Sequence, residues 1–511
     1  MDVIVVGSGG AALTAAYTVA RAGLRTLVLE KTEYFGGTSA YSGSGIWLPG
    51  NQAQKRAGVD DSVEKGREYF RAVVGDDTPR ENQEAFLSAG PELVEFLERD
   101  PALEFEYGMF PDYFEAPGRV ENGRDIFPVR IKAAELGDRL AQLRPTIGED
   151  QHGLLERRRT LTGGQALIGR FLLALDATGA AELRTGSRVR ELLVEAGRVT
   201  GVVTEEQGSV REIRARKGVI VAAGGWECDD ELRAEHHGLP HGEWTSSAPG
   251  SNTGDALRAL QGAGAAIDLM DEAWWCPATL FPNGRAAFTL GLSGGIVINA
   301  AGERFANECL PYDRMGREIL RGHATGTSHI PAWLVFDSRF ANIPAIAQPM
   351  PDPEAFRAAG LWRTADDLAD LAARIEVPEA SLEKTVARFN QFAADGTDAD
   401  FHRGDDPYDR FFAGGGDGGP NPCLVPVDRA PFHALQIVPG DLGTKGGART
   451  DVNGQVLRPD GSPVPGLYAA GNSAASVTGH AYPGPGTPLG SGMVFGYRAA
   501  RHLAGLEAGA G

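Results

Sequence analysis

The first thirty residues alternate between short apolar runs and small residues. Val3–Val6 and Thr26–Leu29 are continuous apolar runs, which is typical of parallel strands that are buried on both faces. Between them, Gly7-Ser8-Gly9-Gly10-Ala11-Ala12 leads into a helical stretch that ends near Ala22. The order strand, glycine turn, helix and strand predicts a βαβ unit at the start of an α/β domain.

Further strands are predicted in the middle and near the end of the chain. Ser187–Val194, Arg198–Thr204 and Val210–Arg214 alternate apolar and polar residues between turn residues, which predicts an antiparallel meander. Gly218–Ala223 and Gly466–Ala470 are apolar runs that stop at glycines. We expect these two runs to join one sheet around a cofactor.

The residue pattern of 274–439 differs from that of the flanking segments and predicts a second, α+β domain. Thr364 is expected to cap one helix and Pro378 to open another, because apolar residues follow each at helical spacings. Phe401–Asn421 is rich in Gly, Asp and Pro, which predicts an irregular surface loop. The expected domains are therefore a cofactor domain over 1–273 and 440–511, interrupted by a catalytic domain over 274–439.

The glycine turn has the residues of a dinucleotide-binding βαβ unit. Gly7 permits the tight turn, Gly9 lets the backbone approach a pyrophosphate at the helix N-terminus, and Ala12 is small enough for helix–strand packing. Glu30 ends the second strand, where a carboxylate accepts hydrogen bonds from a ribose. The motif therefore predicts a bound dinucleotide.

The segment after Glu30 favours a flavin over a nicotinamide. Residues 35–45 are a run of glycines and small hydroxyl residues, which lets the backbone follow a large planar cofactor. All ten histidines lie at or beyond His152, so the glycine-rich N-terminal region has no imidazole to bond covalently to the flavin. We expect non-covalent FAD in an α/β, Rossmann-like domain with a parallel sheet and an antiparallel meander.

Composition and charge restrict the kinds of partner that the chain is expected to bind. Lys and Arg number 49 and Asp and Glu 68, a net charge of −19 without any basic block, which argues against nucleic acid. No apolar run reaches the roughly 18 residues that span a bilayer, so we expect a cytoplasmic protein, with loose membrane association left open. The four cysteines are too widely spaced for a CxxC pair or a zinc cluster, so no metal is expected.

The loop Gly479–Thr487 is the strongest candidate for chemistry. Pro483 and Pro485 stiffen the chain and lack N–H groups, which leaves the Gly486 amide as a lone donor near the Tyr482 phenol. A phenol and an amide that converge would bind a ketone oxygen. On these residues alone, an ordinary surface turn is the alternative.

Several segments together carry a family resemblance. The chain resembles the flavoproteins of the succinate dehydrogenase and fumarate reductase superfamily and, within it, the 3-ketosteroid Δ1-dehydrogenases. The more specific segments are Pro439–Gly447 and Tyr482–Gly486. The segments shared across the superfamily are Val5–Gly9, Gly36–Ser39, Leu161–Leu167, Gly302–Glu308 and Phe401–Gly404.

One position separates the branches of this superfamily. Fumarate reductases carry a proton-delivering arginine five residues after the position of Asn307, where this chain has Tyr312. Thr487–Ser491 also lacks the basic residue that holds substrate carboxylates in the dicarboxylate branch. The resemblance therefore implies an apolar ketone, a steroid or related cyclic ketone, as substrate.

The resemblance also implies roles for individual residues. Desaturation beside a ketone removes an α proton and a β hydride, and a polarised carbonyl makes the α proton acidic. Tyr482 and Gly486 would hold the ketone oxygen, Tyr312 would be the base, and Tyr113 would pass the proton on. The hydride would go to flavin N5, and a quinone or similar acceptor would reoxidise the flavin.

The flavin contacts implied by the resemblance are spread over the cofactor domain. Asn472 departs from the glutamate that many members have near the ribityl chain. The implied contacts are Gly7, Ser8, Gly9, Ala11, Ala12, Glu30, Lys31, Gly37, Thr38, Ser39, Ser42, Gly43, Val189, Ala223, Gly224, Asn472, Pro488 and Leu489. Trp274, Trp275, Phe281, Phe288 and Phe432 are candidates for pocket walls, with core packing as the alternative.

Three interpretations stay open at this point. The first is 1,2-desaturation of a 3-ketosteroid in steroid degradation. The second is desaturation at another bond, such as the 4,5 bond, or of another cyclic ketone, or the reverse reaction of a fumarate-reductase-like enone reductase. The third is a flavin-binding protein without turnover.

Overall fold

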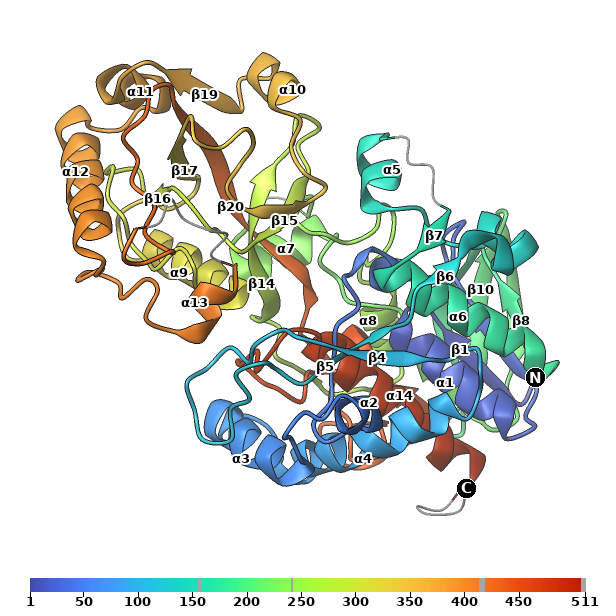
Figure 1. Ribbon diagram of the computed structural model, residues 1–511. Coiled ribbons are helices and arrows are strands. Elements are labelled where there is room, and N and C mark those ends of the chain that lie inside the picture. Colours follow the sequence, from blue (N-terminus) through green and yellow to red (C-terminus); the bar gives the residue numbers. More distant parts are fainter. Residues whose placement is uncertain (155–158, 240–241, 413–418, 507–511) are drawn as a thin grey trace. The chain divides into compact units, whose positions relative to one another are not determined.

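A six-stranded sheet in the computed structural model joins strands from both ends of the sequence (Figure 1). Its order is β22-β23-β12-β1-β2-β8, and all neighbours are parallel except β22 and β23. The expectation that the two glycine-terminated runs join one sheet is confirmed, and β12 lies directly beside β23. The strands are β1 Val3–Val6, β2 Thr26–Leu29, β8 Ala181–Arg184, β12 Gly218–Val221, β22 Gln455–Leu457 and β23 Pro463–Ala469.

The structure describes residues 1–154, 159–239, 242–412 and 419–506. The chain forms two compact units. Unit 1 comprises Met1–Gly242, Ser247–Ala273 and Gly443–Gly511, and unit 2 comprises Glu243–Ser246 and Trp274–Leu442. The assignment of a cofactor domain and a catalytic domain to 1–273, 274–439 and 440–511 stays a prediction, because compactness alone gives neither unit a role.

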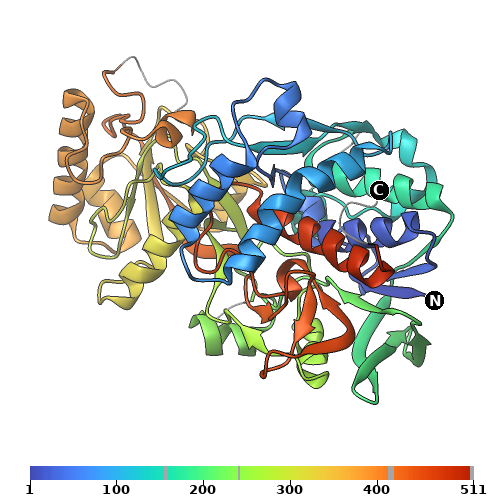
Figure 2. The ribbon, with the colours of Figure 1, turned by 90° about the horizontal axis from the view of Figure 1, so that it is seen from below.

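In unit 1, helices α1 (Gly10–Arg21), α4 (Arg80–Glu98) and α14 (Thr487–Ala504) lie side by side (Figures 1 and 2). A β-carbon on Gly496 of α14 would lie 2.4 Å from the Ala11 carbonyl oxygen, so glycine lets α14 approach α1. The other helices of this unit are α2 Gln52–Arg56, α3 Val63–Val74, α5 Ile147–His152, α6 Gly163–Thr178, α7 Asp230–His237, α8 Asp255–Gly262 and the short 3₁₀ segments Gly37–Tyr41, Ala133–Gln142 and Gly471–Ser473.

The predicted meander is present in unit 1. Strands β9 (Ser187–Glu195), β10 (Arg198–Glu206) and β11 (Ser209–Arg214) pair antiparallel. A second small sheet has the order β3-β5-β4. The small strands are β3 Ile46–Trp47, β4 Phe105–Gly108, β5 Asp125–Pro128, β6 Ile131–Lys132, β7 Thr160–Leu161, β13 Ile267–Asp268 and β21 Gly447–Ala448.

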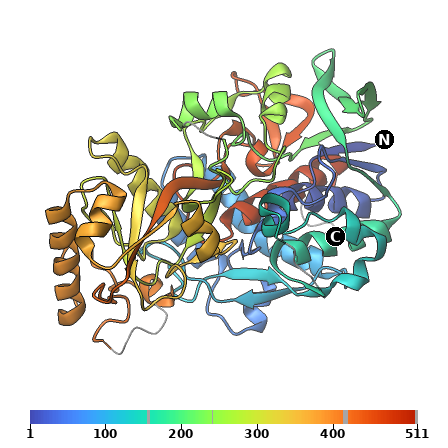
Figure 3. The same ribbon diagram turned by 90° about the horizontal axis from the view of Figure 1, so that it is seen from above.

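Unit 2 is built on a sheet with the order β16-β17-β20-β14-β15-β18, and β19 also pairs with β20 (Figure 3). Side chains of β17 alternate between two cores: Trp333 and Val335 pack with α11 and α12, while Leu334 packs on the opposite face. The strands are β14 Ala273–Leu280, β15 Ala286–Leu290, β16 Ile296–Ile298, β17 Ala332–Asp337, β18 Ile346–Gln348, β19 Trp362–Ala365 and β20 Phe432–Thr444. The helices are α9 Tyr312–Ala324, α10 Pro353–Ala358, α11 Leu368–Ile375, α12 Glu379–Asp395 and α13 Pro407–Phe412.

Two local predictions in unit 2 need correction. Thr364 does not cap α11: it lies in β19, and the Asp367 side chain caps the helix by accepting from the Asp370 N–H. Phe401–Asn421 is not wholly an irregular surface loop, because it contains α13 and the buried Tyr408. Residues 413–418 of that prediction lie outside the described residues. The helix after Pro378 is confirmed as α12.

None of the helices in the described ranges combines the length and the hydropathy that crossing a bilayer requires.

Candidate functional site

Tyr113 and Tyr482, far apart in the sequence, lie together in unit 1. Their ring centroids are 5.3 Å apart with an interplanar angle of 58°, and both side chains are buried. The Tyr113 backbone N–H donates to the Pro483 carbonyl at 3.0 Å, which ties the two segments directly. The structure therefore brings together two of the three predicted catalytic tyrosines.

Buried donors hold the loop that carries Tyr482. The Tyr69 hydroxyl donates to the Pro483 carbonyl at 2.6 Å, and burial first and the Asp112 charge second keep the pKa of Tyr69 well above its usual value. Lys445, which is fully buried, donates to the carbonyls of Ala481 at 2.6 Å and Gly479 at 3.1 Å. Sequence reasoning missed Lys445 as a holding residue, although it lies inside the specific segment Pro439–Gly447.

Gly486 ends this loop as the N-cap residue of α14. Its φ is 74°, and a β-carbon there would lie 2.2 Å from the Gly45 carbonyl oxygen, so another residue would be strained and would clash. Its N–H donates to no other residue in the part of the chain that the structure describes. The role of this amide as a donor to a ketone oxygen stays a prediction.

Tyr312 lies in unit 2, as the first residue of α9 after Pro311. Its side chain is buried, and its ring meets Phe288 edge to face at a centroid distance of 4.9 Å. Phe288 is thus a candidate wall aromatic that contacts a predicted catalytic residue within its own unit. Phe281 and Phe432 pack in the cores of unit 2, and Trp274 and Trp275 are buried.

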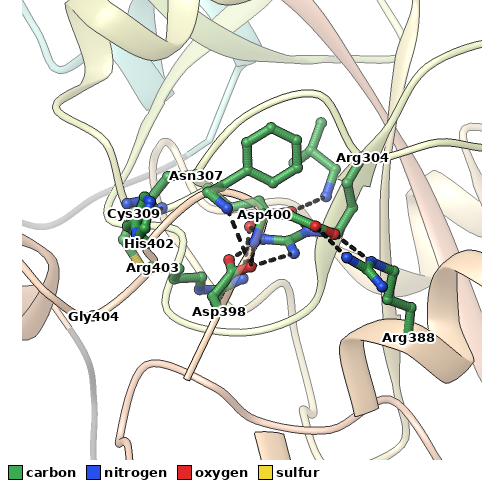
Figure 4. A network of polar contacts seen from close by, with 12 residues as sticks. Arg304, Asn307, Cys309, Arg388, Asp398, Asp400, His402, Arg403 and Gly404 are labelled. Carbon is green, nitrogen blue, oxygen red and sulfur yellow. Dashed lines mark hydrogen bonds and ion pairs between the residues drawn. The ribbon is translucent and has the colours of Figure 1, made fainter. Parts of the chain in front are cut away.

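A buried ionic network joins the segment before Tyr312 to residues near 400 (Figure 4). Arg304 pairs with Glu308 and Asp398, each at 2.8 Å, and Arg403 pairs with Glu308 at 3.0 Å. Burial raises the pKa of Glu308, but the charges and hydrogen bonds of Arg304 and the charge of Arg403 outweigh it, so the pKa is lowered. The network holds the segment Gly302–Glu308 in one arrangement, three residues before α9.

The predicted dinucleotide turn has the expected geometry in unit 1. Gly7 has a φ of 103°, and Gly9 is the N-cap of α1, so the first N–H groups of the helix lie at the turn. Ser8 donates from its hydroxyl to Glu30 at 2.5 Å and accepts from the Gly36 N–H at 2.9 Å. Glu30 is buried, so its carboxylate faces the turn rather than solvent.

The second glycine run borders open space. Ser39 accepts from the Gly10 N–H at 3.1 Å, which brings this run beside the start of α1. A β-carbon on Gly37 or Gly43 would meet no atom within 4 Å. Ser42 donates to the Ser39 carbonyl at 2.8 Å. The backbone at Gly37 and at Gly43 therefore has open space beside it.

The remaining predicted contacts come from several elements of unit 1. Lys31 pairs with Asp255 at 3.0 Å, so its ammonium is already compensated. Val189 is buried on β9. The Ala223 N–H donates to Ser473, which donates in turn to the Gly224 carbonyl. Ala11 and Ala12 lie in α1, Asn472 in the 3₁₀ segment Gly471–Ser473, and Pro488 and Leu489 in the first turn of α14.

Glu227 was not predicted, yet it lies at the centre of a polar cluster. The Asn252 amide donates to its Oε1 at 2.5 Å and the Thr444 N–H to its Oε2 at 3.2 Å. Ser247 donates to Glu227 and accepts from Thr38 at 3.3 Å, which joins the cluster to a predicted flavin residue. The available signal was the position of Glu227 just after Gly224-Gly225.

The cradle fits FAD, because its parts match the parts of that cofactor. The α1 N-terminus and the adjacent glycines suit a pyrophosphate. The buried Glu30 carboxylate suits ribose hydroxyls, and the open space beside Gly37 and Gly43 suits the flavin portion. These residues of unit 1 can therefore hold the cofactor.

Glu30→Ala should weaken FAD binding by about 10- to 150-fold, because hydrogen bonds to a charged group contribute about 1.5–3 kcal/mol. FAD titration of the apoprotein, followed by flavin fluorescence, measures this affinity. Glu33→Ala, which removes an exposed carboxylate three residues away, is the matched control and should bind FAD normally. Normal affinity in Glu30→Ala would show that this carboxylate does not touch the ribose.

Comparison with known proteins agrees with this cradle. A family model described as "FAD binding domain" matches residues 2–489. The 3-oxosteroid 1-dehydrogenase of Mycobacterium tuberculosis is 40% identical, and the match covers 98% of each chain. The 4-oxocyclohexanecarboxylate 2-dehydrogenase of Sinomonas cyclohexanicum is 36% identical over 99% of this chain and 93% of its own. The 3-ketosteroid Δ1-dehydrogenase of Sterolibacterium denitrificans, solved with 1,4-androstadiene-3,17-dione, aligns with a TM-score of 0.90 at 34% identity over 99% of both chains.

Proposed function

We propose that this chain, which belongs to the FAD-binding flavoprotein family of the 3-oxosteroid 1-dehydrogenases, removes hydrogen across the C1–C2 bond of a 3-ketosteroid. The observation that carries the proposal is the loop Gly479–Thr487 of unit 1, whose backbone is held by buried donors. In this loop the buried Tyr482 phenol is followed by Gly486, whose N–H is available. FAD, bound without a covalent link, supplies the acceptor for the hydride from C1.

Tyr482 and Gly486 are the proposed donors to the ketone oxygen. Removal of a proton from C2 moves negative charge onto that oxygen, and donors that are already oriented stabilise it without reorganisation. Tyr69 and Lys445 supply this orientation, since they hold the loop backbone at Pro483, Ala481 and Gly479. A single donor of this kind typically contributes about 10²–10³ in rate.

Tyr312 is the proposed base that removes the C2 proton. It acts as a phenolate, and the N-terminal end of α9 is where a helix dipole stabilises negative charge. The edge of Phe288 restrains its ring. Tyr113, which packs beside Tyr482, is the proposed group that passes the proton on.

The acceptor that reoxidises FAD is proposed to be a quinone or a similar small oxidant. The proposed location of the protein is the cytoplasm. The substrate skeleton is proposed to be apolar, because Thr487–Ser491 after the loop brings no basic side chain for a carboxylate. The Sinomonas cyclohexanicum relative, by its name, oxidises a ring ketone that carries a carboxylate. Such ring ketones are therefore the alternative substrate class to the steroids.

The test is turnover of purified holoenzyme with 4-androstene-3,17-dione and an artificial electron acceptor. The expected product is 1,4-androstadiene-3,17-dione, identified by chromatography and mass. Parallel assays use a 5α-reduced 3-ketosteroid, 4-oxocyclohexanecarboxylate, and fumarate with reduced enzyme.

Each alternative function predicts a different result in these assays. A product desaturated at C4–C5 would move the reaction to another bond, and faster turnover of the cyclohexane acid would replace the steroid as substrate. Oxidation of reduced enzyme by fumarate would favour the reductase. Bound FAD with no turnover of any ketone would favour a flavin-binding protein without catalysis.

A further inference from the structure

Asp125, the first residue of β5, is a buried carboxyl group that the proposed reaction does not use. It is fully buried, and neither of its carboxyl oxygens has a hydrogen-bond partner among the described residues. A β-carbon on Gly45 would lie 3.0 Å from its Oδ1, and one on Gly486 would lie 2.7 Å from it. The carboxyl group is therefore packed directly against the residue whose N–H is proposed to hold the ketone oxygen.

The one buried arginine beside Asp125 is already paired with two other carboxylates. Arg124 pairs with Asp112 at 2.9 Å and with Asp61 at 3.0 Å, and all three of these side chains are buried. One guanidinium therefore faces two carboxylates before Asp125 is counted. On β4, Tyr107 is the titratable group that interacts with Asp125. Trp47 on β3 and the first turn of α14 bring no charge.

A carboxylate in this position would be unstable. An ionised group that is buried without hydrogen bonds loses its hydration with no compensation, so the proton stays on. Burial first and the Asp112 charge second raise the pKa of Asp125 well above its usual value, and the attraction of Arg124 is too small to reverse this. The geometry and the charge balance thus agree on an uncharged acid.

We propose that Asp125 is a positioning residue that stays uncharged, and so leaves the N-terminal end of α14 and the Gly486 N–H free to stabilise the enolate oxygen. An anion against Gly486 would neutralise the positive end of the helix and repel the charge that develops on the substrate. This inference rests on the proposed function, because it assigns the Gly486 N–H to the ketone oxygen.

The pH dependence follows from the sign of this effect. The protonated form of Asp125 is the active one, so turnover should fall when pH rises through the raised pKa of the folded protein. The base has the opposite dependence, because a phenolate is favoured by high pH. An alkaline decline in turnover therefore separates Asp125 from Tyr312.

The experiment compares wild-type holoenzyme with Asp125→Asn, which has nearly the same shape and cannot ionise. Infrared spectroscopy should show the carbonyl stretch of a protonated carboxyl group in the wild type at neutral pH, and this band should be missing in Asp125→Asn. The wild-type kcat for 4-androstene-3,17-dione should fall about tenfold per pH unit above the pH at which the band disappears. Asp125→Asn should lose this alkaline decline.

Several results would overturn the inference. They are a wild type without the band at neutral pH, an alkaline decline that persists in Asp125→Asn, and a band that disappears with rising pH while turnover stays unchanged. If Asp125→Asn does not fold, Asp125→Leu takes its place in both measurements. Absence of turnover with every ketone contradicts the proposed function, whereas a missing band with normal turnover contradicts the uncharged state of Asp125 alone.

Discussion

Tyr312→Phe should keep its bound FAD and lose about 10²–10⁴-fold in kcat with 4-androstene-3,17-dione, the usual contribution of a positioned base. The substitution removes only the hydroxyl group, and the ring can still pack against Phe288. Steady-state turnover with an artificial acceptor measures kcat, and the visible flavin spectrum reports bound FAD. Loss of activity with an unchanged spectrum would separate chemistry from cofactor binding.

Tyr497→Phe is the matched control for this prediction. Tyr497 is also buried, and its hydroxyl donates a hydrogen bond to Glu92 at 2.9 Å. It belongs to no proposed catalytic step. We expect its kcat to stay within about threefold of wild type, since removal of such a hydrogen bond costs about 0.5–1.5 kcal/mol of stability rather than of activation energy. Normal turnover in Tyr312→Phe would rule out the proposed base.

Glu308→Gln should destabilise unit 2 by about 3–5 kcal/mol, the usual cost of breaking a buried ion pair from one side. Within the described ranges, Glu308 is the only carboxylate at ion-pair distance from Arg403, whose side chain is fully buried. The substitution would leave that guanidinium without a counter-charge. For a unit of this size the thermal midpoint should fall by roughly 6–20 °C.

Arg388→Ala is the corresponding control, and Figure 4 shows Arg388 with its partner near the same network. The Arg388–Asp400 pair is largely exposed, so its removal should cost at most about 1 kcal/mol. Circular dichroism melting of both holoenzyme variants at a fixed excess of FAD gives the comparison. Equal midpoints for the two variants would mean that the buried network adds little stability.

The cofactor cradle was predictable because its signals are local. Val3–Val6, Gly7 and Glu30 belong to one short βαβ unit, where strand, turn and carboxylate follow from residues that are near in sequence. Misassigned details have local causes too. Thr364 looked like a helix cap, but a β-branched residue also suits a strand, and the following Asp367 is the better cap.

The holding residues of the candidate site were not predictable from spacing. Tyr69 reaches Pro483 across 414 positions of the chain, and Lys445 reaches Gly479 across 34. Tyr113 had an undistinguished sequence context, and only folding places its ring beside Tyr482. Such contacts depend on how distant segments of the chain pack. Neither the hydrophobic periodicity nor a sequence motif indicates this packing.

The sequence by itself determined the first βαβ unit with its FAD-binding turn, the antiparallel meander, and the loop in which Tyr482 precedes Gly486, because these follow from backbone preferences and neighbouring side chains. Tertiary structure alone decided which charges are buried together. Arg124 meets Asp112 and Asp61, and the carboxyl oxygens of Asp125 have no hydrogen-bond partner among the described residues. Protonation depends on the loss of water and on distant charges, so the electrostatic character of the site exists only in the folded chain.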